Sequence, residues 1–210
     1  MQDEEKNGIA DKLAKVVYVV FYPLLIPVYG MLLLFSAPTL LGYLPGSIKK
    51  IVLIILITNN LFVPLALMPF LRFRGYISSF RMDDRQERII PLLLSALLYS
   101  VTAYIFIKFQ IPFFIKSYIF SVFFLVIAAT VINFWYKISI HAIAAGGLTA
   151  LVFILSLRMH VPLTEYIIMT VIFSGLVLSA GLQLRRHSPA EVWTGFLTGV
   201  AGMIFILLIF

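Results

Sequence analysis

Long apolar runs follow one another along most of the chain and are separated by short polar stretches. A helix needs roughly 20 apolar residues to cross the ~30 Å hydrocarbon core of a bilayer. Apolar segments of this kind lie at residues 16–35, 51–71, 89–107, 112–134, 138–157, 166–184 and 192–210. The runs are continuous rather than alternating, which argues against membrane-spanning strands. The pattern predicts an all-α fold, a polytopic transmembrane helical bundle of six to seven helices.

Residues 1–15 differ from the rest of the chain because they are polar and rich in acidic side chains. A secretory signal begins with a basic region instead, so the first span should be retained. We therefore expect a polar N-terminal segment over residues 1–15 and a single transmembrane helical domain over residues 16–210.

Prolines and asparagines interrupt the first two apolar segments. Pro23 and Pro27 each remove a backbone donor and should kink the first span. Asn59 and Asn60 lie near the middle of the second span. We interpret them as hydrogen-bond partners of a neighbouring helix, and the alternative is a role in a polar pathway.

Small residues are concentrated in the last three apolar segments. They are Gly146, Gly147, Ser174, Gly175, Ser179, Ala180, Gly181, Gly195 and Gly199. Small side chains allow helix backbones to approach closely in a membrane. The last three helices are therefore expected to form the tight centre of the bundle.

The composition supports a membrane protein and limits the kinds of partner that it is expected to bind. Hydrophobic residues make up 62% of the chain and charged residues 12%, against ~25% charged in soluble domains. The net charge of +7 comes from basic residues that flank the apolar runs, as expected for anchoring against anionic lipid. The lipid bilayer is thus the expected partner and nucleic acid is not. The absence of cysteine excludes disulfides, thiolate metal ligands and a cysteine nucleophile.

The basic residues also predict an orientation in the membrane. With a cytoplasmic N-terminus, eleven of the 16 Lys and Arg residues lie on the cytoplasmic side. These are Lys6, Lys12, Lys15, Arg72, Arg74, Arg81, Arg85, Arg88, Lys137, Arg185 and Arg186. Cytoplasmic loops carry an excess of Lys and Arg, which favours this orientation.

Polar clusters at residues 81–88, 137–141 and 185–191 are each separated from the next by two crossings. All of them should therefore lie on one face of the membrane. The clusters contain two of the three histidines together with several arginines. His160, the third histidine, falls in a short loop on the opposite face and is interpreted as an ordinary loop residue.

His141 stands near the start of the fifth apolar segment. Ser139 is suited to cap the first turn of that helix. The free N–H groups of the turn offer a seat for an anion, with Lys137 beside it. The alternative is an interfacial lysine, a capping serine and a histidine that bonds to a neighbouring helix.

His187 precedes the last apolar segment. Ser188, Pro189 and Glu191 have the spacing of a capping box with proline at the first helical position. Glu191 therefore has a purely structural interpretation. In the functional interpretation, Glu191 holds the imidazole of His187 in one tautomer and raises its basicity.

Arginines dominate the first and last clusters. Arg81, Arg85 and Arg88 are spaced by four and three residues and would share one side of a helical turn. Arg185 and Arg186 directly precede His187. Guanidinium donors suit phosphate oxygens, so we expect these arginines to bind phosphate. The alternative is pairing with the neighbouring acidic residues in a solvated loop.

These clusters together resemble the type 2 phosphatidic acid phosphatase superfamily, whose signatures are KxxxxxxRP, PSGH and SRxxxxxHxxxD. Arg81 and Arg88 are similar to the first signature, with the proline delayed to Pro91. Residues 137–141 are similar to the second, keeping its serine and histidine. Residues 187–195 are similar to the third, with Glu in place of Asp. The phosphatase-like core would span residues 81–210.

The resemblance implies a role for each site residue. His187 would be the nucleophile, Glu191 its orienting acid, and His141 the general acid that protonates the leaving oxygen. Arg81, Arg88 and Ser139 would hold the phosphate. No cofactor and no metal ion are implied. The resemblance is to a divergent bacterial member, so the implied location is the bacterial cytoplasmic (inner) membrane.

The chain also departs from the family pattern. The arginine expected six residues before the third-motif histidine is Gly181, so Arg185 or Arg186 would have to replace it in space. Two spans lie between the first and second motifs, where the family usually has a loop. Bacterial members commonly act on the periplasmic face, opposite to the orientation that the charges predict.

The sequence thus predicts an integral membrane lipid phosphate or polyprenyl diphosphate phosphatase that acts through a phosphohistidine intermediate. The ligand would be a membrane lipid with a phosphate headgroup. The main alternative is a catalytically inactive phosphatase-like protein that binds, carries or senses an anionic lipid, which Gly181 favours. Asp83 and Asp84 resemble a motif of prenyl-transferring membrane enzymes, but a second acidic motif is absent.

Overall fold

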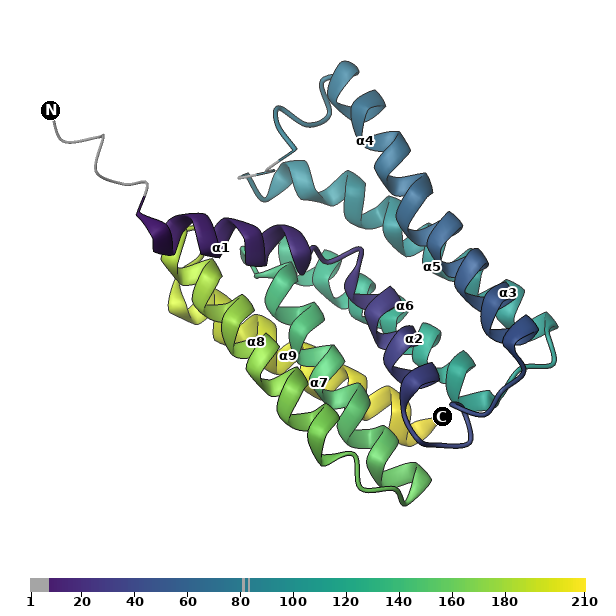
Figure 1. The fold of residues 1–210 in the computed structure, drawn as a ribbon. Coiled ribbons are helices and arrows are strands. Elements are labelled where there is room, and N and C mark those ends of the chain that lie inside the picture. The colour runs from purple at the N-terminus through teal and green to yellow at the C-terminus, as the bar shows by residue number, and fades with distance from the viewer. Residues whose placement is uncertain (1–7, 81, 83) are drawn as a thin grey trace, which may run out of the picture.

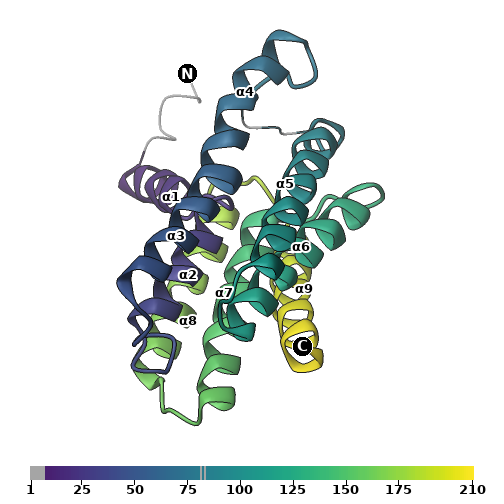
Figure 2. The ribbon, with the colours of Figure 1, turned by 90° about the vertical axis from the view of Figure 1, so that its right-hand side faces the viewer.

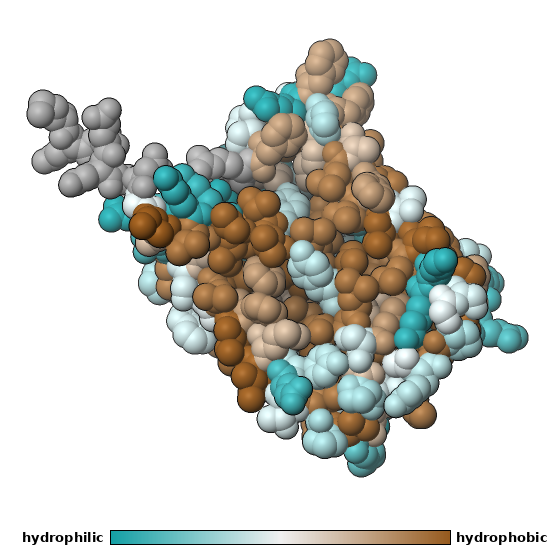
Figure 3. All heavy atoms as spheres, in the orientation of Figure 1, coloured by the Kyte–Doolittle hydropathy of each residue, from teal (hydrophilic) through white to brown (hydrophobic). Residues whose placement is uncertain are grey.

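The computed structural model describes residues 8–80, 82 and 84–210, and its regular elements in this part of the chain are all helical (Figure 1). Six continuous helices are long and apolar enough to cross a membrane. They are Gly46–Phe73, Gln86–Lys108, Phe113–Asn133, Ile140–Met159, Thr164–Gln183 and Pro189–Ile209. Figure 3 shows hydrophobic atoms over the middle of the molecule and hydrophilic atoms toward its two ends. The chain is therefore a multi-pass membrane protein with the predicted helical-bundle fold.

Most of these helices match the predicted segments closely. They are α5 (Ile89–Lys108), α6 (Phe113–Asn133), α7 (Ile140–Met159), α8 (Thr164–Gln183) and α9 (Pro189–Ile209). A short 3-10 turn, η2 (Gln86–Arg88), leads into α5. In lipid each backbone polar group must be satisfied within the segment, so continuous apolar runs become helices.

The prediction of one kinked span over residues 16–35 is wrong. The chain forms α1 (Ile9–Val20), a turn, and then α2 (Ile26–Ser36), which has only 11 residues. Pro23 lacks an N–H donor and disfavours helical backbone at the residue before it, so the helix ends instead of bending. α1 also extends across the predicted boundary at residue 15 and crosses the end of α8 at a steep angle (Figure 1).

The second span contains a wider turn at its middle. It consists of α3 (Gly46–Ile57), the π-helical turn η1 (Thr58–Phe62) and α4 (Val63–Phe73). Asn59 Nδ2 donates to the Leu98 carbonyl at 2.7 Å and to Thr102 Oγ1 at 2.6 Å, and Asn60 Nδ2 donates to the same Thr102 oxygen at 2.6 Å. The prediction that these asparagines bond to a neighbouring helix is confirmed.

α7 lies in the middle of the bundle in both ribbon views (Figures 1 and 2). Its closest neighbour is α9, and glycines make this approach possible. A Cβ atom on Gly146 would collide with the Phe196 carbonyl, and one on Gly199 with the Ile143 carbonyl. α8 packs on α7 and α1 but touches α9 only slightly. The predicted tight centre is therefore the α7–α9 pair, with α8 outside it.

One end of the bundle collects the residues that the sequence singled out. The α1–α2 turn, the segment after α4, and the connections from α6 to α7 and from α8 to α9 all lie there, because each span reverses the chain direction. Helices α5, α7 and α9 begin at this end (Figure 1). We call it the polar end.

Candidate functional site

A cavity of about 450 Å³ opens at the polar end, a volume usual for a small-molecule site. We call it the upper cavity. Its polar lining residues are Lys15, Tyr18, Tyr22, Arg88, Ser95, His141, Arg186 and His187. Among the described residues no Asp or Glu lines it. A concave site with cationic side chains and no lining carboxylate favours an anionic ligand.

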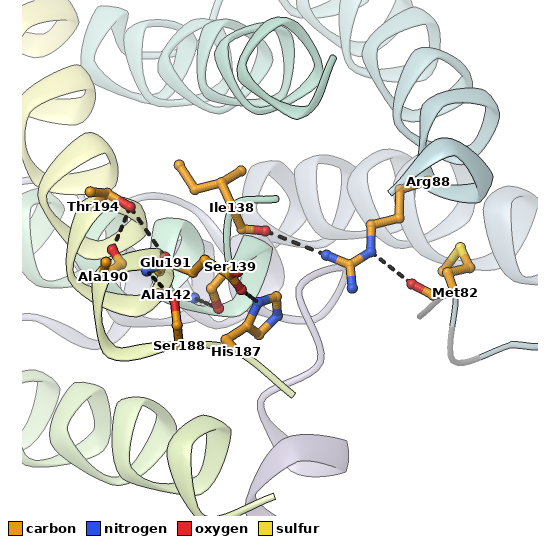
Figure 4. A network of polar contacts seen from close by, with 10 residues as sticks. All are labelled: Met82, Arg88, Ile138, Ser139, Ala142, His187, Ser188, Ala190, Glu191 and Thr194. Carbon is orange, nitrogen blue, oxygen red and sulfur yellow. Dashed lines mark hydrogen bonds and ion pairs between the residues drawn. The ribbon is translucent and has the colours of Figure 1, made fainter. Parts of the chain in front are cut away.

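His187 is held by a single strong contact from α9. Its Nδ1 lies 2.7 Å from Glu191 Oε2, one turn further along the chain (Figure 4). A carboxylate only accepts hydrogen bonds, so Nδ1 carries the proton. In the neutral ring the lone pair therefore lies on Nε2, the nitrogen that a phosphohistidine mechanism requires.

The start of α9 explains why His187 and Glu191 meet. Ser188 is the N-cap residue, and its Oγ accepts from the Glu191 N–H at 3.3 Å. Pro189 occupies the first turn, where its missing donor costs nothing. This capping fixes Glu191 in the first turn, facing back toward the residue before the cap. Glu191 thus has both the position in the first helical turn and the contact with His187 that the two interpretations require.

The charge state of His187 is set by opposing effects. Burial lowers its pKa below the usual 6.5, the hydrogen bond to Glu191 raises it, and the nearby Arg88 guanidinium lowers it. Burial is the largest of these effects, so the net shift is downward. His187 is therefore neutral at pH 7, as a nucleophile must be.

Ser139 ties the start of α7 to the start of α9. Its Oγ accepts from the Ala142 N–H at 3.3 Å, which makes it the predicted N-cap. Its own N–H donates to the Glu191 carbonyl at 3.3 Å. Because the second bond reaches the same residue that holds His187, the two histidine segments are joined directly through backbone.

Arg88 reaches across from the start of α5 (Figure 4). Its side chain is only 8% exposed, and it donates Nε to the Met82 carbonyl at 2.8 Å and Nη1 to the Ile138 carbonyl at 3.4 Å. Ile138 precedes Ser139, the cap of α7, so this contact fixes α5 against the segment that carries His141. The buried guanidinium places a permanent positive charge in the cavity wall.

His141 is covered by α1. The Tyr18 ring stacks on its ring with centroids 3.8 Å apart, and His141 Nε2 lies 3.3 Å from the Tyr18 carbonyl oxygen. A carbonyl only accepts, so Nε2 carries a proton that it donates to α1. The general-acid role predicted for His141 would require a charged ring that gives a proton to a leaving oxygen instead of donating it to the Tyr18 carbonyl.

Tyr18 also packs against Gly181, the position where the phosphatase resemblance expects an arginine. A Cβ atom at Gly181 would lie 3.2 Å from the Tyr18 hydroxyl oxygen, so a larger side chain there would require Tyr18 to shift. The Arg186 guanidinium lies 4.8 Å from the centroid of the same tyrosine ring and lines the upper cavity. Arg186, rather than Arg185, therefore lies beside the tyrosine that packs on Gly181 and lines the upper cavity.

Other predicted phosphate ligands lie farther from the upper cavity. Arg81 falls outside the described residues. Arg85 does not line the cavity, and its carbonyl accepts from Asn133 Nδ2 at 2.7 Å. Arg185 borders a shallow depression on the outer side of His187. Lys137 does not line the cavity either, although its charge contributes to lowering the pKa of His187.

Tyr18 and Lys15 are cavity residues that sequence reasoning missed. The signal was present, because residues 9–20 place Lys12 and Lys15 on a polar face beside apolar residues at helical spacing. Assigning the segment from residue 16 to a span concealed this amphipathic pattern. His160, by contrast, caps the C-terminal end of α7 in a left-handed backbone conformation. It lies at the opposite end of α7 from the cavity, in the loop where it was predicted.

The arrangement suits chemistry on an anion at a helix start. Arg88, His141 and His187 stand at or just before the first turns of α5, α7 and α9. The unpaired N–H groups of helix starts carry partial positive charge, which adds to that of the arginines. Within the described part of the chain no group of three His, Asp or Glu residues is placed to hold a metal ion.

Comparison of the chain with protein-family models, curated proteins and solved structures finds no match. The resemblance to the phosphatase superfamily thus rests on the residues of the three sequence clusters alone.

Proposed function

We propose that the protein is an integral membrane phosphatase that acts on a lipid phosphate or polyprenyl diphosphate through a phosphohistidine. The observation that carries the proposal is the imidazole of His187, held by Glu191 at a cavity lined by Arg88 and Arg186. A nucleophile beside cations that neutralise phosphoryl charge is the arrangement that phosphoryl transfer requires. We propose the bacterial cytoplasmic membrane as its location.

The proposed reaction has two steps. His187 Nε2 attacks phosphorus, a P–N bond forms, and the bond from phosphorus to the lipid oxygen breaks. The leaving oxygen takes a proton from His141, which must be in its charged, doubly protonated form before this step. Water then attacks the phosphohistidine and gives a proton to His141, the P–N bond breaks, and phosphate leaves. Both imidazoles thereby return to their starting forms.

Phosphate release by purified protein tests this function. Phosphatidate, phosphatidylglycerophosphate and undecaprenyl diphosphate are supplied separately in mixed micelles. Wild type should release phosphate from at least one of them, and His187→Ala should fall to the rate without protein. His160→Ala is the matched control, because it removes a histidine from the opposite end. Equal rates for wild type and His187→Ala on all three lipids would end the phosphatase proposal.

A second function is favoured by the contact between His141 and α1. The proton of His141 Nε2 is directed to the Tyr18 carbonyl, and the family arginine is absent at Gly181. A protein that binds or senses an anionic lipid needs the cations but no free general acid. Saturable binding of these lipids, without release of phosphate, would support this alternative.

A further inference from the structure

The upper cavity continues into the interior of the bundle. A second cavity of about 90 Å³, here called the lower cavity, lies between α2, α5, α6, α7 and α9. The two share part of their walls. The shared residues are Pro23, Leu24, Leu92, Ser95 and Ile140. The two cavities are therefore adjacent, and they lie along one path from the cationic polar end toward the interior of the bundle.

Residues of α5 mark the depth of this path. Arg88, Leu92, Ser95 and Tyr99 follow one another at helical spacing, and each lines one or both cavities. Tyr99 comes 11 positions after Arg88, a descent of about 16 Å along a helix. That is about half of the ~30 Å hydrocarbon thickness of a bilayer.

The wall of the lower cavity is mostly apolar, and its Tyr99 hydroxyl is buried with no hydrogen-bond partner among the described residues. Small residues on α6 and α7 create the space, namely Ala129, Ala144 and Gly147. The hydroxyl of Ser95 donates to the Pro91 carbonyl at 2.8 Å, and that of Tyr118 to the Pro27 carbonyl at 2.9 Å. A wall of this kind favours an apolar occupant, because burial of apolar surface against it is favourable.

The upper cavity also reaches the surface of the protein. Val19 of α1 and Phe80 after α4 both line it, and they are 71% and 49% exposed. A hydrocarbon chain would therefore meet apolar side chains where it enters the cavity.

We propose that the two cavities together bind one hydrocarbon chain of a phosphate-bearing amphiphile, with its phosphate at Arg88 and Arg186. The inference rests on the proposed function for the place of the phosphate. It adds that the chain lies inside the bundle and not in the bilayer. The lower cavity is thus a binding site for an alkyl, acyl or prenyl chain.

Photocrosslinking tests the position of the chain. The probe is hexadecylphosphonate with a diazirine at its last carbon, which cannot be hydrolysed. Crosslinks mapped by mass spectrometry should fall on residues that line the lower cavity, such as Tyr99, Leu125 and Leu148. Hexadecanol with the same diazirine should not give these crosslinks, because it lacks the anion. Crosslinks confined to the outer faces of the spans, or equal for both probes, would overturn the proposal.

Substitutions that fill the lower cavity provide the second arm. Ala144→Phe should abolish the lower-cavity crosslinks, and Ala129→Leu serves as an independent filling variant from α6. Ala201→Phe is the matched control, since Ala201 is exposed on the outside of α9. A filling variant counts as folded when its thermal unfolding midpoint equals that of wild type. Unchanged crosslinks in a folded filling variant would contradict the proposal.

Failure of the two proposals can be told apart. Lower-cavity crosslinks without phosphate release from any lipid would reject the phosphatase and keep the chain site. Phosphate release without lower-cavity crosslinks would reject the chain site and keep the phosphatase.

Discussion

At the scale of single residues, the protonation of His187 controls what the site can do. Its Nδ1 proton is bound by Glu191, so only a neutral ring has a lone pair on Nε2. As pH falls through its pKa, the ring gains a proton there and the proposed nucleophile is lost. Because burial holds that pKa below 6.5, kcat/KM should decline only below pH 6.5 on the acidic side.

Glu191→Gln tests this dependence. The carboxylate raises the pKa of His187 through its hydrogen bond and through its charge. A glutamine keeps an acceptor oxygen but removes the charge, so the pKa should fall further. The acidic limb of kcat/KM against pH, which reports the free enzyme, should therefore move to lower pH, with a lower plateau.

Glu165→Gln is the control for this change. Glu165 is exposed in the first turn of α8, at the opposite end of the molecule. Its substitution should leave the pH profile where it is in wild type. An acidic limb that stays in place, or moves upward, in Glu191→Gln would mean that His187 is not the titrating group.

Contacts of short sequence range could be predicted, and those of long range could not. The side-chain bonds of Ser139, Ser188 and Glu191 link residues three or four positions apart, so helical spacing alone predicts them. The stacking of Tyr18 on His141 joins positions 123 apart, and nothing in local spacing encodes it. Because α1 was taken for part of a span, its contribution to the cavity wall was not predicted.

At the scale of helices, the α7–α9 contact sets the relative position of the two histidine segments. The helices approach so closely that Gly199 lies against the Ile143 carbonyl, and a Cβ there would also lie 2.9 Å from the Gly147 nitrogen. These neighbours are backbone atoms, which cannot rotate away. The distance between the helix starts therefore depends on glycine at this position.

Gly199→Ala should destabilise the fold by about 1–3 kcal/mol, the usual cost of inserting a methyl group into a packed interior. Thermal unfolding in detergent measures the change. Gly175→Ala is the matched control, because no heavy atom lies within 4 Å of a Cβ at Gly175. Alanine should be neutral or slightly stabilising there. Equal midpoints for the two variants would show that the close approach does not limit stability.

Helix positions were predictable where the apolar run was uninterrupted. The starts and ends of α5 to α9 lie within a few residues of the predicted segments because lipid leaves the backbone no other structure. The prediction for the first segment failed because a helix ends near Pro23, although the apolar run continues past it. Small residues indicated close packing, but they could not indicate which helix would be the partner. Gly175 accordingly faces open space.

At the scale of the whole molecule, the parity of the spans decides where the site lies. The described clusters meet at the polar end because two spans separate each from the next, and this required only a correct span count between residues 84 and 191. Replacing the first predicted span by α1 and the short α2 changes the start of the chain without changing that parity. The orientation of the polar end in the membrane depends instead on the basic residues.

Cysteines introduced into this cysteine-free chain test the orientation. Gln86→Cys places an exposed thiol at the polar end, and Tyr43→Cys places one in the loop at the other end, where Tyr43 is 81% exposed. The excess of Lys and Arg predicts a cytoplasmic polar end. An impermeant maleimide should therefore label Tyr43→Cys in intact cells and Gln86→Cys only after permeabilisation. The reverse pattern would place His187 on the outer side, where the proposed chain site could take lipid only from the outer leaflet.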